Sequence, residues 1–181
     1  MTVKPWKAVA ISFAVACAGS AFAPPAFAQS ADRVAVHTDW SVFVAASPKE
    51  CYIVSPPKSS AATRDGKPAE VQRGDIRLFV AFRPGENVSN EVSFTGGYPF
   101  QDGGSVTLAV GSESFTLTPG AGDAGEWAWT APADDSRVVA ALKRGASAKL
   151  TGTSSRGTRT DDTFSLAGFT AAVEDAAARC R

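Results

Sequence analysis

Hydrophobic and polar residues alternate along this chain in many short runs, and the clearest run lies near the middle. Its members are Ile76, Leu78, Val80 and Phe82, which alternate with Arg77, Phe79 and Ala81. A period of two is typical of a β-strand. Because Phe79 and Ala81 make the second face apolar too, the pattern predicts a central strand within residues 73–100. Turn residues at 83–87 and the run at 91–94 predict its return strand.

Shorter runs of the same kind lie on both sides of this pair. They predict strands at residues 40–44, 51–55, 106–110, 114–118, 126–130, 147–151 and 163–166. We interpret residues 31–39 as a polar lead-in, 58–67 as a surface loop and 152–162 as a polar turn. Many short strands with turn signals between them predict a mainly β fold, a compact antiparallel β-sandwich or barrel-like domain.

Two stretches show a helical period instead. In residues 134–144, aspartates near the start and basic residues near the end complement a helix dipole. In residues 169–180 one stripe contains Phe169, Ala172, Val173, Ala176 and Cys180. The domain should therefore carry one or two short helices, including a C-terminal helix with Cys180 on its buried side.

The first residues have the pattern of a targeting segment. Lys4 and Lys7 precede an apolar, alanine-rich run, and Ala26-Phe27-Ala28 is an A-x-A cleavage site. The pattern predicts a secretory signal peptide at 1–28, one domain at 29–181 and a periplasmic, envelope or secreted location. A competing interpretation makes Cys17 a lipidated first residue, although residues 14–16 match the usual lipobox poorly. No later stretch is long and apolar enough to predict a transmembrane segment.

Cysteine and charge counts narrow the class of protein further. Cleavage after Ala28 would leave Cys51 and Cys180, and an even number of cysteines in an exported chain indicates a disulfide. The whole chain has 18 Lys+Arg and 18 Asp+Glu, and the signal peptide would remove two lysines but no acid. The slightly negative domain gives no reason to expect a nucleic-acid partner.

Three short motifs each have a plainer structural interpretation. Residues 120–125 match G-x-G-x-x-G, but a strand pattern follows where a dinucleotide site needs a helix, so a loop is favoured. Arg73-Gly74-Asp75 is an integrin-type tripeptide, which we interpret as a turn whose glycine permits positive φ. Trp127 and Trp129 share a face and could stack on sugars, but core packing is favoured for such large side chains.

Groups suited to catalysis or metal binding are scarce. His37 is the single histidine and no motif surrounds it. Asp134-Asp135 begins a predicted helix, and Asp161-Asp162 enters a strand, where neighbours point to opposite faces. The sequence lacks zinc and calcium patterns. We therefore predict a non-enzymatic protein with no catalytic residue, cofactor or metal ligand.

Several segments together resemble the invasion-associated locus B family. They are residues 39–40, 51–58, 90–94, 140–145, 154–158 and 162–169, and the most distinctive is the Ser-Leu-Ala-Gly-Phe run at 165–169 before an alanine-rich helix. The family comprises secreted or envelope proteins of alphaproteobacteria. The resemblance implies a β-rich exported domain without known catalytic residues. It also implies binding or surface interaction, including host-cell invasion, with an unknown envelope or host-surface partner.

Two alternatives stay open at this point. One is a periplasmic enzyme with an unidentified carboxylate and serine site, which a cluster of Asp, Ser and Arg in a deep pocket would support. The other is a purely structural envelope protein, over which a long exposed apolar patch would favour a protein-binding role.

Overall fold

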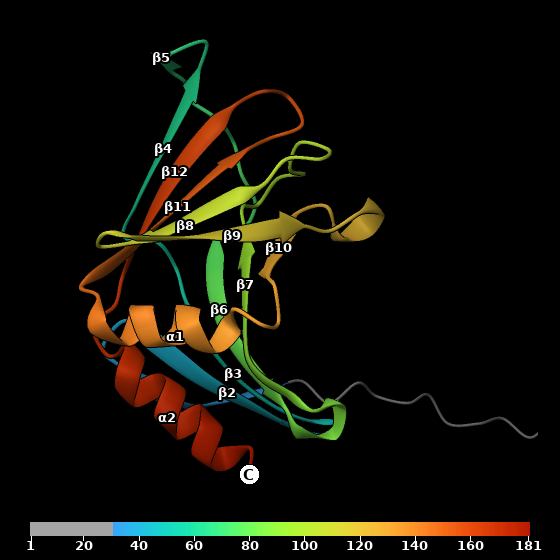
Figure 1. Cartoon of the computed structure of the whole chain (residues 1–181), viewed down its shortest axis with the longest axis vertical. Helices are drawn as coiled ribbons and strands as arrows, with labels where there is room; N and C mark the ends of the chain where they lie inside the picture. Colours follow the sequence, from blue (N-terminus) through green and yellow to red (C-terminus); the bar gives the residue numbers. More distant parts are fainter. Residues whose placement is uncertain (1–30) are drawn as a thin grey trace, which may run out of the picture.

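The computed structural model describes residues 31–181, and within them twelve strands form one antiparallel sheet (Figure 1). The strands are β1 (Asp32–His37), β2 (Trp40–Ala46), β3 (Lys49–Ser55), β4 (Ser59–Arg64), β5 (Lys67–Pro68), β6 (Arg77–Arg83), β7 (Val88–Thr95), β8 (Val106–Val110), β9 (Glu113–Pro119), β10 (Trp127–Thr130), β11 (Ser147–Thr153) and β12 (Arg159–Ser165). The helices are α1 (Asp135–Arg144) and α2 (Phe169–Arg179), with 3-10 turns η1 (Pro84–Glu86) and η2 (Gly122–Ala124). The predicted signal peptide and Cys17 lie outside the described residues.

The sheet bends so strongly that strands far apart in its order come into contact. That order is β1-β2-β3-β6-β7-β10-β9-β8-β11-β12-β4-β5, yet Phe94 on β7 packs edge-on against Phe164 on β12 with ring centroids 6.1 Å apart. The indole nitrogen of Trp40 on β2 donates to the Ser165 carbonyl on β12 at 3.0 Å. The two halves of the sheet therefore enclose one core, as in a sandwich.

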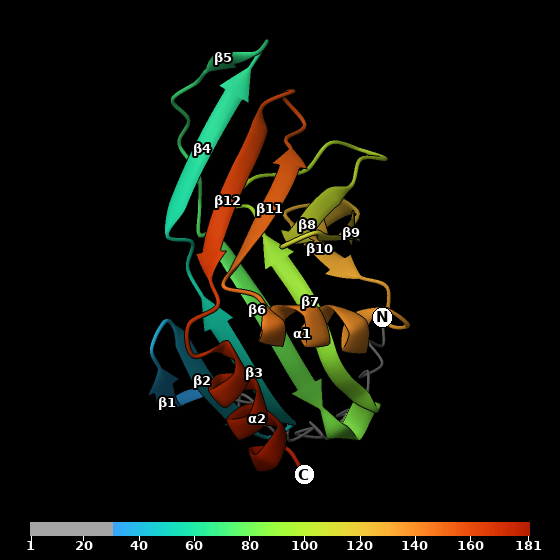
Figure 2. The ribbon, with the colours of Figure 1, turned by 60° about the vertical axis from the view of Figure 1, so that its left-hand side comes forward.

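Alternation along the strands decides which residues form that core. Leu78 and Val80 on β6 are fully buried, and their partners on neighbouring strands are Phe94 and Val92. Helix α2 packs on β2 and β3, and α1 packs on β7, so both helices cover the inner face (Figure 2). Apolar side chains removed from water contribute roughly 25 cal/mol per Å², which makes this inner face the main source of stability.

The predicted fold class is confirmed, as are both helices to within one residue at each end. The predicted central strand also lies inside the sheet, between β3 and β7. Three predictions of irregular structure are wrong. Residues 31–39 contain β1, 58–67 contain β4 and β5, and the turn inside 152–162 shrinks because β11 and β12 extend into it. Strands β1, β4 and β5 lie at or near the sheet edges and bury few side chains, so they lack the apolar alternation that marks the others.

The predicted bond between Cys51 and Cys180 is present, with the two Cα atoms 5.8 Å apart. Cys51 is a buried residue of β3, and Cys180 is the C-cap of α2. The bond joins residues 129 positions apart, and so it fixes the end of the last helix to the sheet. A loop of this length stabilises the folded state by about 4–5 kcal/mol in the chain-entropy model.

We predict that Cys51→Ser combined with Cys180→Ser lowers the free energy of unfolding by about 4–5 kcal/mol, because the unfolded chain regains the entropy of an open loop. Urea unfolding of the oxidised protein and the double variant measures the difference. Adding reductant should lower the stability of the wild type and leave the double variant unchanged. Equal stability of the two proteins would contradict the prediction.

Candidate functional site

A buried ion pair joins the segment before β6 to strand β12. The guanidinium of Arg73 donates to both carboxylate oxygens of Asp162, at 2.8 and 2.7 Å, and the Arg73 Nε donates to the Gly96 carbonyl at 2.8 Å. The Arg73 side chain is 8% exposed and the Asp162 side chain 0%. Two parallel charge-assisted bonds of this kind are strong and directional. The pair therefore holds the two halves of the sheet together at this point.

Tyr98 and two glycines complete the surroundings of this pair. The Arg73 guanidinium lies 4.9 Å from the centroid of the Tyr98 ring, and the Tyr98 hydroxyl contacts the Thr160 hydroxyl at 2.5 Å. Burial raises the pKa of Tyr98 above its ordinary value. The Gly74 N–H donates to the Gly97 carbonyl at 2.9 Å, and a Cβ on Gly97, at φ +69°, would clash with the Gly74 backbone. Only glycine fits at Gly97.

A cavity of about 460 Å³ lies over this pair. Its wall includes the exposed arginines Arg64 and Arg156, the ring of Tyr98, and the carboxylates of Glu70 and Glu126. The parts of the chain that contribute are β4, the β11–β12 turn, the start of β12, the segment at residues 70–73, the residues around Gly97, and Glu126 just before β10. Cavities of a few hundred Å³ with convergent polar groups commonly bind small ligands.

Arg and Ser side chains gather here, as the enzyme alternative required, but no aspartate lines the cavity among the described residues. Both oxygens of Asp162 are bonded to Arg73. The Ser154 hydroxyl accepts from the backbone N–H groups of Arg156 and Thr158, which shapes the β11–β12 turn. A serine nucleophile needs a base within hydrogen-bond reach, and no such pair lines the cavity among the described residues. The arrangement suits binding.

A second feature occupies the outer face of the sheet, away from the core. Five aromatic side chains, each half-buried, form a continuous row, with ring centroids 5.1, 6.0, 5.3 and 6.2 Å apart from one neighbour to the next. In order they are Phe43 on β2, Tyr52 on β3, Phe79 on β6, and Trp127 and Trp129 on β10. We call these five residues the aromatic row. At the nearby edge strand β1, Val34 and Val36 are exposed.

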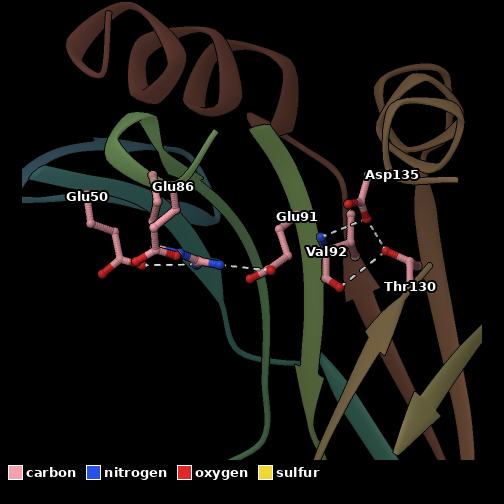
Figure 3. A network of polar contacts seen from close by, with 7 residues as sticks. Glu50, Glu86, Glu91, Val92, Thr130 and Asp135 are labelled. Carbon is pink, nitrogen blue, oxygen red and sulfur yellow. Dashed lines mark hydrogen bonds and ion pairs between the residues drawn. The ribbon is translucent and has the colours of Figure 1, made fainter. Parts of the chain in front are cut away.

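Three carboxylates and one arginine border the aromatic row. Arg83 contacts Glu50, Glu86 and Glu91 at 3.4, 2.9 and 2.9 Å (Figure 3). The hydrogen bond to Glu91 is the main reason why the pKa of Arg83 is raised. Glu50 precedes Tyr52 by two residues in β3 and so shares its face. With three acids and one base, this border is negative.

Asp135 has a different role, at the start of α1. Its carboxylate is buried and accepts from the Val92 N–H at 3.2 Å and from the Thr130 hydroxyl (Figure 3). Burial raises the pKa of Asp135 above its ordinary value, although both hydrogen bonds oppose the shift. The residue attaches α1 to β7 and β10. Its neighbour Asp134 is the N-cap residue of α1, so this aspartate pair is structural.

The other residues singled out by the sequence are scattered. His37 lies in β1 and contacts Asp175 on α2 at 3.1 Å, far in sequence from the cavity residues. Asp161 points away from Asp162 and accepts from Thr151 at 2.5 Å, as strand alternation predicts. Among residues 31–181, no group of three or more His, Cys, Asp or Glu side chains could hold a metal ion.

The structure also settles the three motifs. Residues 120–125 form a loop that contains η2 and leads into β10, as predicted. The Arg73-Gly74-Asp75 tripeptide does not present both charges, because Arg73 is buried while Asp75 is 84% exposed. Positive φ occurs at Gly97 rather than at Gly74, which corrects that prediction.

The favoured prediction for the two tryptophans, core packing, is wrong. Ala128 and Thr130 take the buried positions of β10, while Trp127 and Trp129 lie on the outer face. On the inner face of β10, Ala128 is fully buried and the Thr130 hydroxyl donates to Asp135. The alternation Trp-Ala-Trp-Thr was the available signal. The large size of the two tryptophan side chains led to the wrong face of the strand.

These features define a β-rich domain whose folded sheet is tied to a C-terminal helix by a disulfide. The family model described as invasion associated locus B (IalB) protein matches residues 122–177. The fold is that of the crystal structure of invasion associated protein b from Bartonella henselae. That protein is 18% identical, with a TM-score of 0.54 over 83% of this chain and 97% of the other. A comparison with curated proteins finds no match. The resemblance to the invasion-associated locus B family is thus confirmed.

We predict that Arg73→Met lowers the free energy of unfolding by about 3–5 kcal/mol, because it leaves the Asp162 charge buried without a partner. Replacing both, as Arg73→Met with Asp162→Leu, should cost less than Arg73→Met alone. Arg77→Met is the matched control, since Arg77 pairs with the exposed Asp75 and should cost at most about 1 kcal/mol. Denaturant unfolding of the four proteins provides the measurement. Similar losses for Arg73→Met and Arg77→Met would refute the assigned role.

We predict that the stability of the wild type relative to Asp135→Asn falls as pH rises. The folded chain holds the Asp135 proton more tightly than the unfolded chain, so this contribution is complete below the ordinary Asp pKa and is lost as pH passes the raised value. The asparagine keeps an oxygen that can accept from Val92 and Thr130. Unfolding free energies of both proteins from about pH 3 to about pH 7 test this. A constant difference would contradict it.

Proposed function

We propose that this protein is exported, loses residues 1–28, and acts in the periplasm or at the cell envelope by contact with another protein rather than by turnover. The targeting pattern before Gln29 supports export. The disulfide between Cys51 and Cys180 fits an oxidising compartment. No helix within residues 31–181 combines the length and the apolar character needed to cross a membrane.

The aromatic row is the observation that carries the contact function. Outer faces of antiparallel sheets are usually polar, because water covers them. Here five aromatic rings lie side by side on that face, although the core is already complete without them. Aromatic side chains are enriched where protein surfaces meet. A purely structural domain has no need of such a row.

The ring geometry and the charges describe the partner. Phe43 and Tyr52 are nearly parallel, with 6° between their planes, and Trp127 and Trp129 differ by 24°. Rings stacked on one another present edges rather than an open platform for a sugar ring. The carboxylates around Arg83 give the border a negative charge. The best-fitting partner is therefore a protein surface with apolar side chains and nearby Lys or Arg residues.

The family model and the similar crystal structure are both described as invasion associated. In an organism that enters host cells, we propose that the partner lies on the host surface and that the contact contributes to entry. In an organism that does not, the partner would be another envelope protein. The enzyme alternative loses support because the cavity offers no serine with an adjacent base among the described residues.

Complementation of a deletion strain tests the proposal. Deletion should alter adhesion, host entry or envelope integrity, and the wild-type gene should restore the phenotype. The variant Phe79→Ser/Trp127→Ser and the separate variant Glu86→Lys should fail to restore it, because the first removes apolar contacts and the second repels a basic partner. Ser114→Ala/Thr116→Ala, at outward positions of β9 that pair with β8, is the matched control and should complement fully.

Expression level and melting temperature must equal those of the wild type for each variant that is compared. Glu86 is 61% exposed, so Glu86→Lys should leave folding unchanged even if the aromatic variant does not fold. Intact-mass analysis of the protein recovered from the periplasm should give the mass of a chain that begins at Gln29. Loss of complementation by His37→Ala in a stably folded protein would instead support the enzyme alternative, and an acylated Cys17 start would overturn the predicted cleavage.

A further inference from the structure

The cavity over Arg73 has two sides with different charges. The segment from Gly96 to Gln101 runs between them and is hydrogen-bonded to both. On one side, the Gly96 and Phe100 N–H groups donate to the carbonyls of Glu126 and Gly125, at 3.3 and 2.9 Å. On the other, the Gln101 N–H donates to Thr153 and Pro99 accepts from Ser155, both at 2.9 Å. Glu126 and the β11–β12 turn therefore flank this segment from opposite sides.

The side formed by the β11–β12 turn is cationic. Arg64 donates from Nε and Nη2 to the Thr158 hydroxyl at 3.1 and 2.6 Å, which fixes its guanidinium against the turn. Arg156 projects from the same turn and lines the same cavity. Within the described chain, neither arginine has a carboxylate within 4.0 Å. The Nη1 group of Arg64 keeps its donors free for a ligand.

The other side is anionic. Glu126 is exposed in the turn just before β10, and it too forms no ion pair with the described residues. Glu70 brings a second carboxylate into the cavity from the segment after β5, which lies beside β4 because the Ala69 N–H donates to the Ala62 carbonyl at 2.9 Å. Apart from Arg73, whose charge Asp162 balances, the cavity wall thus has two arginines and two glutamates that form no ion pair with one another. A simple anion such as inorganic phosphate would meet these carboxylates, so it fits poorly.

We propose that the cavity binds a small zwitterion, a free amino acid or short peptide. Its carboxylate contacts Arg64 and Arg156, and its ammonium contacts Glu126. Arginine is the residue best suited to bind a planar carboxylate. The volume of about 460 Å³ suits a ligand of this size, and the Tyr98 ring provides an apolar wall. This inference goes beyond the proposed function, because that function concerns the outer face of β2, β3, β6 and β10.

Titration of the mature protein with the dipeptide alanyl-phenylalanine tests the inference by calorimetry or NMR. The N-acetylated and C-amidated forms of the same dipeptide should each bind about tenfold weaker, since each lacks one charge–charge contact. Arg64→Gln and Arg156→Gln should weaken binding of the free dipeptide by about the same factor. They should also abolish the difference in affinity between the free dipeptide and its C-amidated form. Glu126→Gln should abolish the difference in affinity between the free dipeptide and its N-acetylated form.

Two exposed residues outside the cavity provide charge-matched controls. Arg33→Gln and Asp123→Asn change the net charge as the test variants do, and both should leave the affinity unchanged. The inference is overturned if no saturable binding occurs up to on the order of 10 mM dipeptide, or if the blocked forms bind as tightly as the free one. It is equally overturned if inorganic phosphate competes and Glu126→Gln strengthens the binding of phosphate, which would indicate a simple anion site.

Discussion

The architecture depends on one sheet burying its inner face against itself. A single open sheet of this length would leave half of its apolar side chains in water, so the bend is what creates the core. The buried pair of Arg73 and Asp162 is placed at the closure, where the segment before β6 meets β12. Its carboxylate is fully buried, and only a bidentate partner makes that burial tolerable. The cavity exists because the closure leaves space above this pair.

The sequence predicted the strands that bury one face, and for a physical reason. Leu78, Val80 and Phe82 must alternate with outward residues if β6 is to contribute to the core, and that alternation is visible in the chain. The same holds for the helical stripe that ends at Cys180. Strand β4 carries no such signal, because it lies near a sheet edge and its side chains are mostly exposed. Backbone pairing with β12 holds it in place, and pairing leaves no mark in the sequence.

The candidate sites were harder to predict than the fold, since both arise from contacts between distant segments. Arg73 and Asp162 are 89 positions apart, and nothing local in the tripeptide around Arg73 reveals a buried partner. The aromatic row combines side chains from β2, β3, β6 and β10, between Phe43 and Trp129 in the chain. The sequence pattern groups Trp127 with Trp129 alone, and the size of these two side chains favours the core. The small residues that alternate with them, Ala128 and Thr130, indicate that the tryptophans face outward.

Placement on the scaffold separates stability from recognition in this domain. The inner face, the disulfide and the Arg73–Asp162 pair keep the sheet folded, and these elements are buried. The aromatic row and the cavity arginines lie outside the core, on strands and turns that the core already fixes. Side chains held by a rigid frame lose little entropy on binding, which favours recognition over a loop that must first be ordered. Because the row lies on β2, β3, β6 and β10 while the cavity is lined by β4, the β11–β12 turn and the turn before β10, a macromolecular partner and a small ligand could occupy the domain together.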